Sequence, residues 1–234
     1  MVTFEKKNKI LFSNDAFGQH LAVSGIFDTE ISLEISLYEA EKYYANIVMP
    51  YAPQVKKALD AAKSLRPEII APSHGVVWTK HIGDIFALYD RMTAGEKKNK
   101  AVIAYDTMWG NTEIIAKQIG AKFEEICDDV IYANLQTVDR SDLMADIAEC
   151  KYLCVGSPTL NSTMMPSVAA FLNYVTGLKP PALNYVAFGS YGWGGGAIKQ
   201  ICEILDKAGY TKLGEAGAIY KPETLNLKFI DDLK

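Results

Sequence analysis

Three short segments combine glycine, hydroxyl-bearing and aromatic residues in a way that suits cofactor binding. The first, Thr107-Met-Trp-Gly-Asn-Thr112, follows an apolar run and precedes a helical pattern. Backbone N–H groups and the helix dipole at such a position can hold a phosphate without a lysine. The Gly-Lys-Ser/Thr ending of a P-loop is absent, which argues against nucleoside triphosphate hydrolysis. The alternative is that Asn111 or Thr112 only caps the helix.

The other two segments suit a flat ligand. They are Gly156-Ser-Pro-Thr-Leu-Asn161 and Gly189-Ser-Tyr-Gly-Trp-Gly-Gly-Gly196, and each follows an apolar run. Glycines let main-chain amides approach a planar ring closely, and Tyr191 or Trp193 can stack on it. The alternative is a mobile turn in which Trp193 folds onto the core.

These segments lie between elements that alternate along residues 100–234. Strands that alternate with helices form βαβ units, which predicts a doubly wound, five-stranded parallel sheet with both faces covered. Such a sheet binds ligands at the carboxyl ends of its strands, where the strand order reverses. The loops after residues 105, 156 and 188 are therefore the expected site. The predicted strands are 101–105, 129–134, 151–156, 183–188 and 216–220, and the predicted helices are 112–126, 140–149, 166–175 and 196–208.

A polar, glycine-containing stretch, Thr93–Lys100, predicts a domain boundary between residues 1–95 and 100–234. The first segment reads as part of a larger α/β domain, because its few strands leave a sheet edge unfilled. Its predicted elements are strands at 2–12, 20–27 and 68–71, a helical stretch from Leu37 to Leu65 broken near Pro50 and Pro53, and a helix at 81–92.

Composition indicates a folded, soluble protein: 234 residues, 49% hydrophobic and 22% charged. No apolar run reaches the ~20 residues of a membrane span, and no secretory signal is recognised, so we expect a cytoplasmic protein without a membrane partner. Four cysteines without a CxxC pattern predict reduced thiols. The net charge of −4 argues against a nucleic-acid partner and is compatible with a basic redox partner or with simple solubility.

The three segments together resemble the flavodoxin domain of the flavodiiron proteins, also called A-type flavoproteins. The resemblance implies a flavodoxin-like fold at 100–234 that binds FMN, preceded by the end of a metallo-β-lactamase-like domain at 1–95. It implies that the FMN phosphate is held by Thr107, Met108, Trp109, Gly110, Asn111 and Thr112. One side of the flavin ring would be lined by Ser157, Pro158, Thr159, Leu160 and Asn161, and the other by Ser190, Tyr191, Gly192, Trp193, Gly194 and Gly195.

The same resemblance extends to two residues of a diiron site. Asp15 in Leu11–His20 resembles the aspartate that bridges the irons, and His74 in Ala71-Pro-Ser-His-Gly75 resembles the last histidine ligand. The His-x-Glu-x-Asp-His motif of the family is absent, and two ligands are fewer than a transition metal usually takes. The metal site is thus expected to be incomplete, in a truncated or split version of the family. His20 is either a neighbour of the ligands or a surface residue, and His81 has no assigned ligand role.

Three functions remain open. The first is an FMN electron carrier that accepts electrons from a rubredoxin-like or flavin-reductase donor. The second is the FMN-bearing half of a diiron oxygen or nitric oxide reductase, completed by a separate N-terminal chain. The third is an interaction module that keeps the fold without flavin. We also expect residues 1–95 to be the less stable part, which would dimerise or recruit the absent half.

Overall fold

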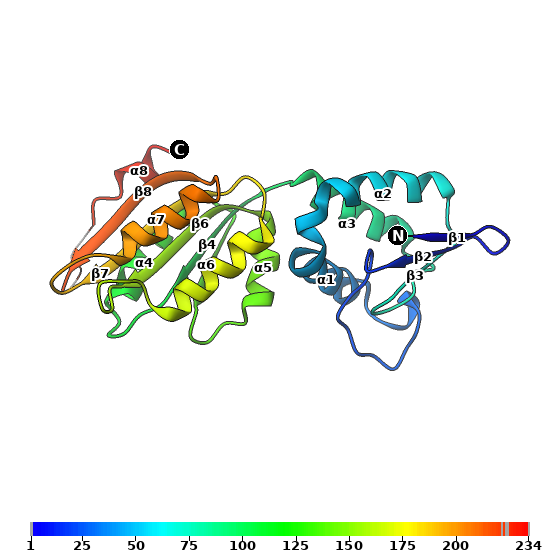
Figure 1. Cartoon of the computed structure of the whole chain (residues 1–234), viewed down its shortest axis with the longest axis horizontal. Coiled ribbons are helices and arrows are strands. Elements are labelled where there is room, and N and C mark those ends of the chain that lie inside the picture. The colour runs from blue at the N-terminus through cyan, green and yellow to red at the C-terminus, as the bar shows by residue number, and fades with distance from the viewer. Residues whose placement is uncertain (1, 221, 223–224, 234) are drawn as a thin grey trace. The chain divides into compact units, whose positions relative to one another are not determined.

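The computed structural model describes residues 2–220, 222 and 225–233. It divides into two compact units, Met1–Glu96 and Lys97–Lys234 (Figure 1). Each is described by itself below. None of the described helices is long and apolar enough to cross a membrane.

The second unit is a five-stranded parallel sheet in the order β5-β4-β6-β7-β8. This is the doubly wound order in which β4 and β6 form the switch point, so the predicted fold class is confirmed. All five predicted strands are present, although the last is longer than expected and begins earlier. The strands are β4 (Lys98–Tyr105), β5 (Asp129–Asn134), β6 (Cys150–Pro158), β7 (Asn184–Tyr191) and β8 (Thr211–Ile219).

Helices cover both faces of this sheet, which is why its central strands read as continuous apolar runs. The connection from β4 to β5 runs towards one edge of the sheet, and the connections from β5 to β8 run towards the other edge. Right-handed crossovers therefore place α4 on one face of the sheet and α5, α6 and α7 on the other face (Figure 1). Side chains of α4 and α8 form one core with Ile103 and Phe188. The helices are α4 (Asn111–Phe123), α5 (Arg140–Glu149), α6 (Pro166–Leu178), α7 (Ala197–Lys207) and α8 (Lys228–Asp231).

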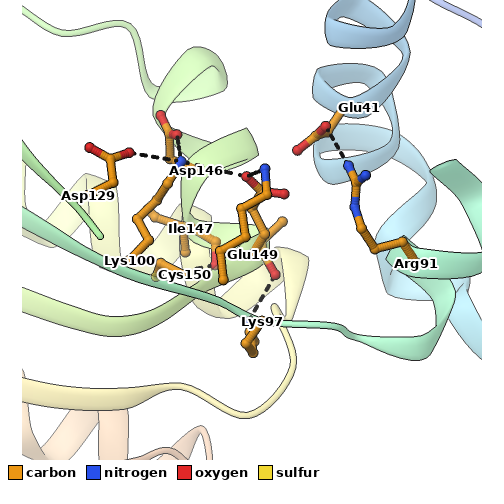
Figure 2. A network of polar contacts seen from close by, with 11 residues as sticks. Glu41, Arg91, Lys97, Lys100, Asp129, Asp146, Ile147, Glu149 and Cys150 are labelled. Atoms are coloured by element: carbon orange, nitrogen blue, oxygen red, sulfur yellow. Dashed lines mark hydrogen bonds and ion pairs between the residues drawn. The ribbon is translucent and has the colours of Figure 1, made fainter. Parts of the chain in front are cut away.

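An ionic network holds the start of β4 to its neighbours (Figure 2). The Lys100 ammonium lies 2.8 Å from the Asp146 carboxylate, 3.4 Å from that of Asp129 and 3.6 Å from that of Glu149. Lys97 donates to the Ala148 carbonyl at 2.9 Å, and burial lowers the pKa of its ammonium. These charges lie at the amino end of β4, the end opposite to the predicted site.

The first unit combines a small sheet with helices. The sheet order is β1-β2-β3, antiparallel between β1 and β2 and parallel between β2 and β3. Several large hydrophobic side chains are exposed on this unit, among them Phe12, Ile26 and Tyr51. Its elements are β1 (Thr3–Glu5), β2 (Ile10–Asn14), η1 (Asp28–Glu30), α1 (Leu33–Tyr43), η2 (Tyr44–Val48), η3 (Met49–Tyr51), α2 (Ala52–Leu65), β3 (Ile69–Pro72) and α3 (Ile82–Ala94).

Two expectations for this unit need correction. The predicted strand at 2–12 is a hairpin of β1 and β2, whose turn is closed by the Glu5 carboxylate accepting N–H groups of Lys7 and Asn8 at 2.7 Å. The predicted strand at 20–27 is wrong, because that segment makes only an isolated bridge between Phe27 and Val77. The helical break near Pro50 is present as a π-helical turn followed by a 3-10 turn.

Candidate functional site

The three predicted loops meet at the carboxyl ends of β4, β6 and β7. They enclose a pocket of about 610 Å³, within the range of small-molecule sites. Its position is the switch point of the sheet, where parallel α/β proteins bind their ligands. The lining residues are Thr107, Met108, Trp109, Asn111, Pro158, Thr159, Leu160, Asn161, Ser162, Ser190, Tyr191, Gly192, Trp193, Gly194 and Tyr220.

The β4 loop leaves the first turn of α4 open. Gly110 occupies the N-cap position at φ +83°, and no side-chain hydrogen bond caps the helix in the described structure. The alternative of Asn111 or Thr112 as a cap is therefore wrong. The Thr107 hydroxyl instead accepts the Gly110 N–H at 3.0 Å. The N–H groups that begin a helix have no partner within it, so those of α4 are available to a phosphate.

Asp106 holds this loop in place through hydrogen bonds, and the sequence patterns did not identify it. Its buried carboxylate accepts the Thr107 N–H and the Gln136 side-chain amide, both at 2.6 Å, and also the Ser167 hydroxyl. These bonds join the loop after β4 to the turn after β5 and to the start of α6. The residue precedes the Thr107–Thr112 pattern, and its supporting role depends on contacts distant in sequence.

The β6 loop makes a tight turn that contacts the β7 loop. Leu160 and Thr163 exchange two backbone hydrogen bonds of 2.9 Å around Asn161 and Ser162, which have φ values of +50° and +65°. The Thr159 hydroxyl accepts the N–H of Gly196 at 3.2 Å. A Cβ at Gly196 would lie 2.1 Å from the Ser162 carbonyl oxygen, so only glycine permits this close approach.

The β7 loop presents Trp193 to solvent. This side chain is 96% exposed, so the alternative in which it folds onto the core is wrong. Trp109 on the β4 loop is 87% exposed as well. Tyr191 differs from both, since its ring packs against Gly195, where an added Cβ would lie 3.0 Å from it. Two indole rings are thus free to contact a planar ligand.

Four of the predicted cofactor residues lie behind the pocket wall. Gly110 shapes the helix start, and Gly195 gives space to the Tyr191 ring. The buried Thr112 hydroxyl shares a hydrogen bond of 2.9 Å with Ser190. The buried Ser157 hydroxyl accepts the Met165 N–H at 2.9 Å. The other predicted residues line the pocket, and Ser162 and Tyr220 line it without having been predicted.

The pocket is electrically neutral. Among the described residues that line it, none carries a formal charge. A phosphate would be held by N–H groups, hydroxyls and the positive end of the α4 dipole. Exposed aromatic rings and glycine-bordered walls suit an aromatic ring system. These features fit a phosphorylated flat cofactor such as FMN.

The structure brings the two predicted metal ligands together in the first unit. Nε2 of His74 lies 3.6 Å from Oδ1 of Asp15. Burial and the nearby Asp15 carboxylate together raise the pKa of the Tyr43 hydroxyl to about 12. The His20 ring packs edge-on against Tyr43, with centroids 4.6 Å apart. Over the described part of the chain, no group of three or more His, Cys, Asp or Glu side chains is arranged to hold a metal.

Gln19 fixes the two loops that carry Asp15 and His74, and sequence patterns did not identify it either. Its fully buried side chain donates to the Phe17 carbonyl at 2.9 Å and accepts the Val76 N–H at 2.7 Å. Its own N–H donates to the His74 carbonyl at 3.2 Å. By contrast, His81 is the N-cap residue of α3 and bonds to Asp84 at 3.0 Å.

Comparisons with known proteins agree with this arrangement. The flavodoxin family model matches residues 103–228. The chain is 41% identical over 219 residues to a nitric oxide reductase of Moorella thermoacetica, covering 93% of this chain and 55% of that protein. It matches the structure of rubredoxin oxygen:oxidoreductase from Desulfovibrio gigas with a TM-score of 0.91 at 33% identity, covering 100% of this chain and 59% of that one.

A second solved structure gives the same result for both units. The flavodiiron protein of Giardia intestinalis matches with a TM-score of 0.89 at 30% identity, covering 99% of this chain and 57% of that one. The chain spans about half the length of the curated relatives it matches.

Proposed function

We propose an electron-transfer function from the premise that this chain belongs to the flavodoxin family and is homologous to flavodiiron proteins. FMN is the cofactor that this relationship implies. The observation that carries the proposal is the neutral pocket that three loops form at the switch point of the sheet. The sheet order and the open start of α4 support it independently.

We assign the residues of this pocket two roles. The loop Thr107–Thr112 would bind the phosphate through main-chain N–H groups, with Asp106 and Thr107 holding its conformation. The β6 and β7 loops would orient the flavin ring, and Trp109 and Trp193 would exclude water from its faces. Bound FMN supplies the exchange of electrons, and the protein supplies binding, orientation and the electrostatic environment.

Flavin titration of the purified, full-length chain tests the proposal. We expect one FMN per chain, with a shifted visible spectrum, and weaker binding of riboflavin because it has no phosphate for the α4 N-terminus. Equal affinities for FMN and riboflavin would contradict the assigned phosphate site. A chain that binds neither flavin would favour the third candidate, a flavodoxin-fold interaction module without a cofactor.

A second function is supported by the pairing of Asp15 with His74. We propose that residues 1–95 are the C-terminal part of a metallo-β-lactamase-like domain, which a separate N-terminal chain would complete to form a diiron oxygen or nitric oxide reductase. A distance of 3.6 Å between the two side chains is compatible with neighbouring ligands. Iron analysis after adding ferrous iron distinguishes the functions. Iron-free protein with full FMN supports the carrier, and two irons per chain support the reductase.

The proposed carrier needs an electron donor. A rubredoxin-like protein or a flavin reductase would dock at the exposed indole rings beside the pocket and reduce the flavin. Either a second copy of this chain or a separate N-terminal chain would cover the exposed apolar side chains of the first unit. All four cysteines are free thiols, which supports a reducing, cytoplasmic setting. Reduction of the FMN-loaded chain by purified donors of the two classes, followed at the flavin absorbance, would identify the donor.

A further inference from the structure

We propose that Tyr220 is a third aromatic contact of the flavin ring, an inference that rests on the proposed FMN site. Tyr220 follows directly after β8 and lines the same pocket as the three predicted loops. In the sheet order, β8 lies beside β7 and is three strands away from β4, which carries the phosphate loop (Figure 1). The residue therefore belongs to the ring end of the pocket rather than to the phosphate end.

The position of Tyr220 is fixed by the β7 loop. Its N–H donates to the Tyr191 carbonyl at 2.8 Å, which extends the ladder between β7 and β8 by one bond. A Cβ at Gly192 would lie 3.5 Å from the Tyr220 ring, so the ring stands directly over this glycine. Tyr220 therefore packs on a loop that would contact the flavin.

The backbone of Tyr220 supports a specific role. Its φ of +54° lies in the left-handed region, which is unfavourable for a bulky residue. Residues with such strained backbone conformations cluster at active sites and ligand-binding sites. Asparagine tolerates this region much better than tyrosine. A turn that needed only the left-handed conformation would be served better by asparagine or glycine. We therefore expect the aromatic ring of Tyr220 to contact the ligand.

Exposure points to a ligand as the partner of this ring. Tyr220 is 61% exposed. Several other large hydrophobic side chains that the second unit exposes line the same pocket, namely Met108, Trp109 and Trp193. A cluster of exposed apolar side chains around one cavity marks a binding site. A flat ring bound there would cover the Tyr220 ring together with the two indoles.

Two substitutions separate the ring from the backbone conformation. Tyr220→Phe keeps the ring, and Tyr220→Asn keeps the left-handed backbone but removes the ring. We expect Tyr220→Asn to raise the Kd of FMN and of riboflavin by the same factor, roughly 5- to 15-fold, as for the loss of one aromatic contact. Tyr220→Phe should stay within about 2-fold of the wild type. Thr107→Ala is the control, since it should weaken FMN binding more than riboflavin binding, whereas Tyr220→Asn should weaken both equally.

A measurement on the wild-type protein tests the inference without requiring that the variants fold. Nitration by tetranitromethane, with and without FMN, can be followed at each tyrosine by mass spectrometry. FMN should protect Tyr220 but not Tyr51, which has nearly the same exposure (62%) and lies in the first unit. Unprotected Tyr220 in the FMN-saturated protein, or unchanged flavin affinities in Tyr220→Asn, would overturn this inference while leaving the proposed function intact. Wild-type protein that binds no flavin would overturn both.

Discussion

Replacing Gly110 with alanine tests whether the conformation of the β4 loop holds the phosphate. Gly110 has φ +83°, and no described atom lies within 4 Å of an added Cβ. The substitution therefore introduces backbone strain without a steric clash. A left-handed residue with a side chain costs roughly 1–2 kcal/mol. The strain is released if the loop relaxes to another conformation, in which the N–H groups of α4 no longer converge.

Gly209 provides a matched control in the same unit. Its φ is +84°, and an added Cβ there likewise meets no described atom within 4 Å. It precedes β8 at the amino end of the sheet, away from the pocket of the three loops. Gly209→Ala should therefore destabilise the apoprotein by about 1–2 kcal/mol in urea unfolding followed by circular dichroism, and Gly110→Ala should destabilise it less, because its relaxed loop releases the strain.

The two variants should differ in FMN binding. FMN binding to Gly110→Ala would force the relaxed loop back into its strained conformation and would lose about 1–2 kcal/mol of binding free energy. This loss corresponds to a Kd increased roughly 5- to 30-fold. Gly209→Ala should bind FMN and riboflavin like the wild type, and Gly110→Ala should lose more affinity for FMN than for riboflavin. Equal FMN affinities in the two variants, measured at matched salt concentration, would refute the assignment of the α4 N-terminus as the phosphate site.

Three further predictions address other parts of the chain. Gln19→Leu should destabilise the first unit by about 1–3 kcal/mol, because the buried Val76 N–H loses its partner while the Phe17 carbonyl keeps the Trp78 indole N–H, and urea unfolding followed by circular dichroism would show it. Hydrogen bonds from the Thr79 hydroxyl and from main-chain N–H groups outweigh burial and lower the pKa of Asp28, so its contribution to stability is present above the unfolded value of 3.8 and is lost as the pH falls further. Asp28→Asn should flatten the stability profile in that acidic range, and an unchanged profile would contradict it. FMN should quench the emission of the exposed Trp109 and Trp193 but preserve the blue-shifted emission of Trp78, and uniform quenching would argue against the assigned pocket.

The fold of the second unit was predictable because its determinants are local. Strands covered on both faces read as short apolar runs, and the connecting helices begin and end close to the expected residues. The segment 20–27 of the first unit was not predictable in this way. Within the described structure, its long-range backbone pairing is with Val77 alone, which donates to the Ile26 carbonyl and accepts the N–H of the adjacent Asp28. Apolar residues there resemble a strand, although the pairing is too short to form one.

The site shows the same division between local and distant determinants. The glycine and hydroxyl patterns identified most of the pocket lining, because each loop follows its strand directly in sequence. Asp106 and Gln19 escaped prediction since their partners lie far along the chain and their roles depend on burial. Tyr220 escaped it because it follows a strand whose loop has no recognisable pattern. Supporting residues of this kind become visible only when their contacts are known.

The two units differ in how far each could act alone. In the second unit, both faces of the sheet are covered and the pocket is formed entirely by its own loops. In the first unit, a buried network around Gln19 orders the loops of Asp15 and His74, but over the described residues these side chains belong to no group of three potential metal ligands. Two such side chains would not complete a metal site, because a transition metal usually takes about four ligands. Flavin binding is therefore expected from this chain by itself, whereas metal chemistry would require ligands from outside the described residues.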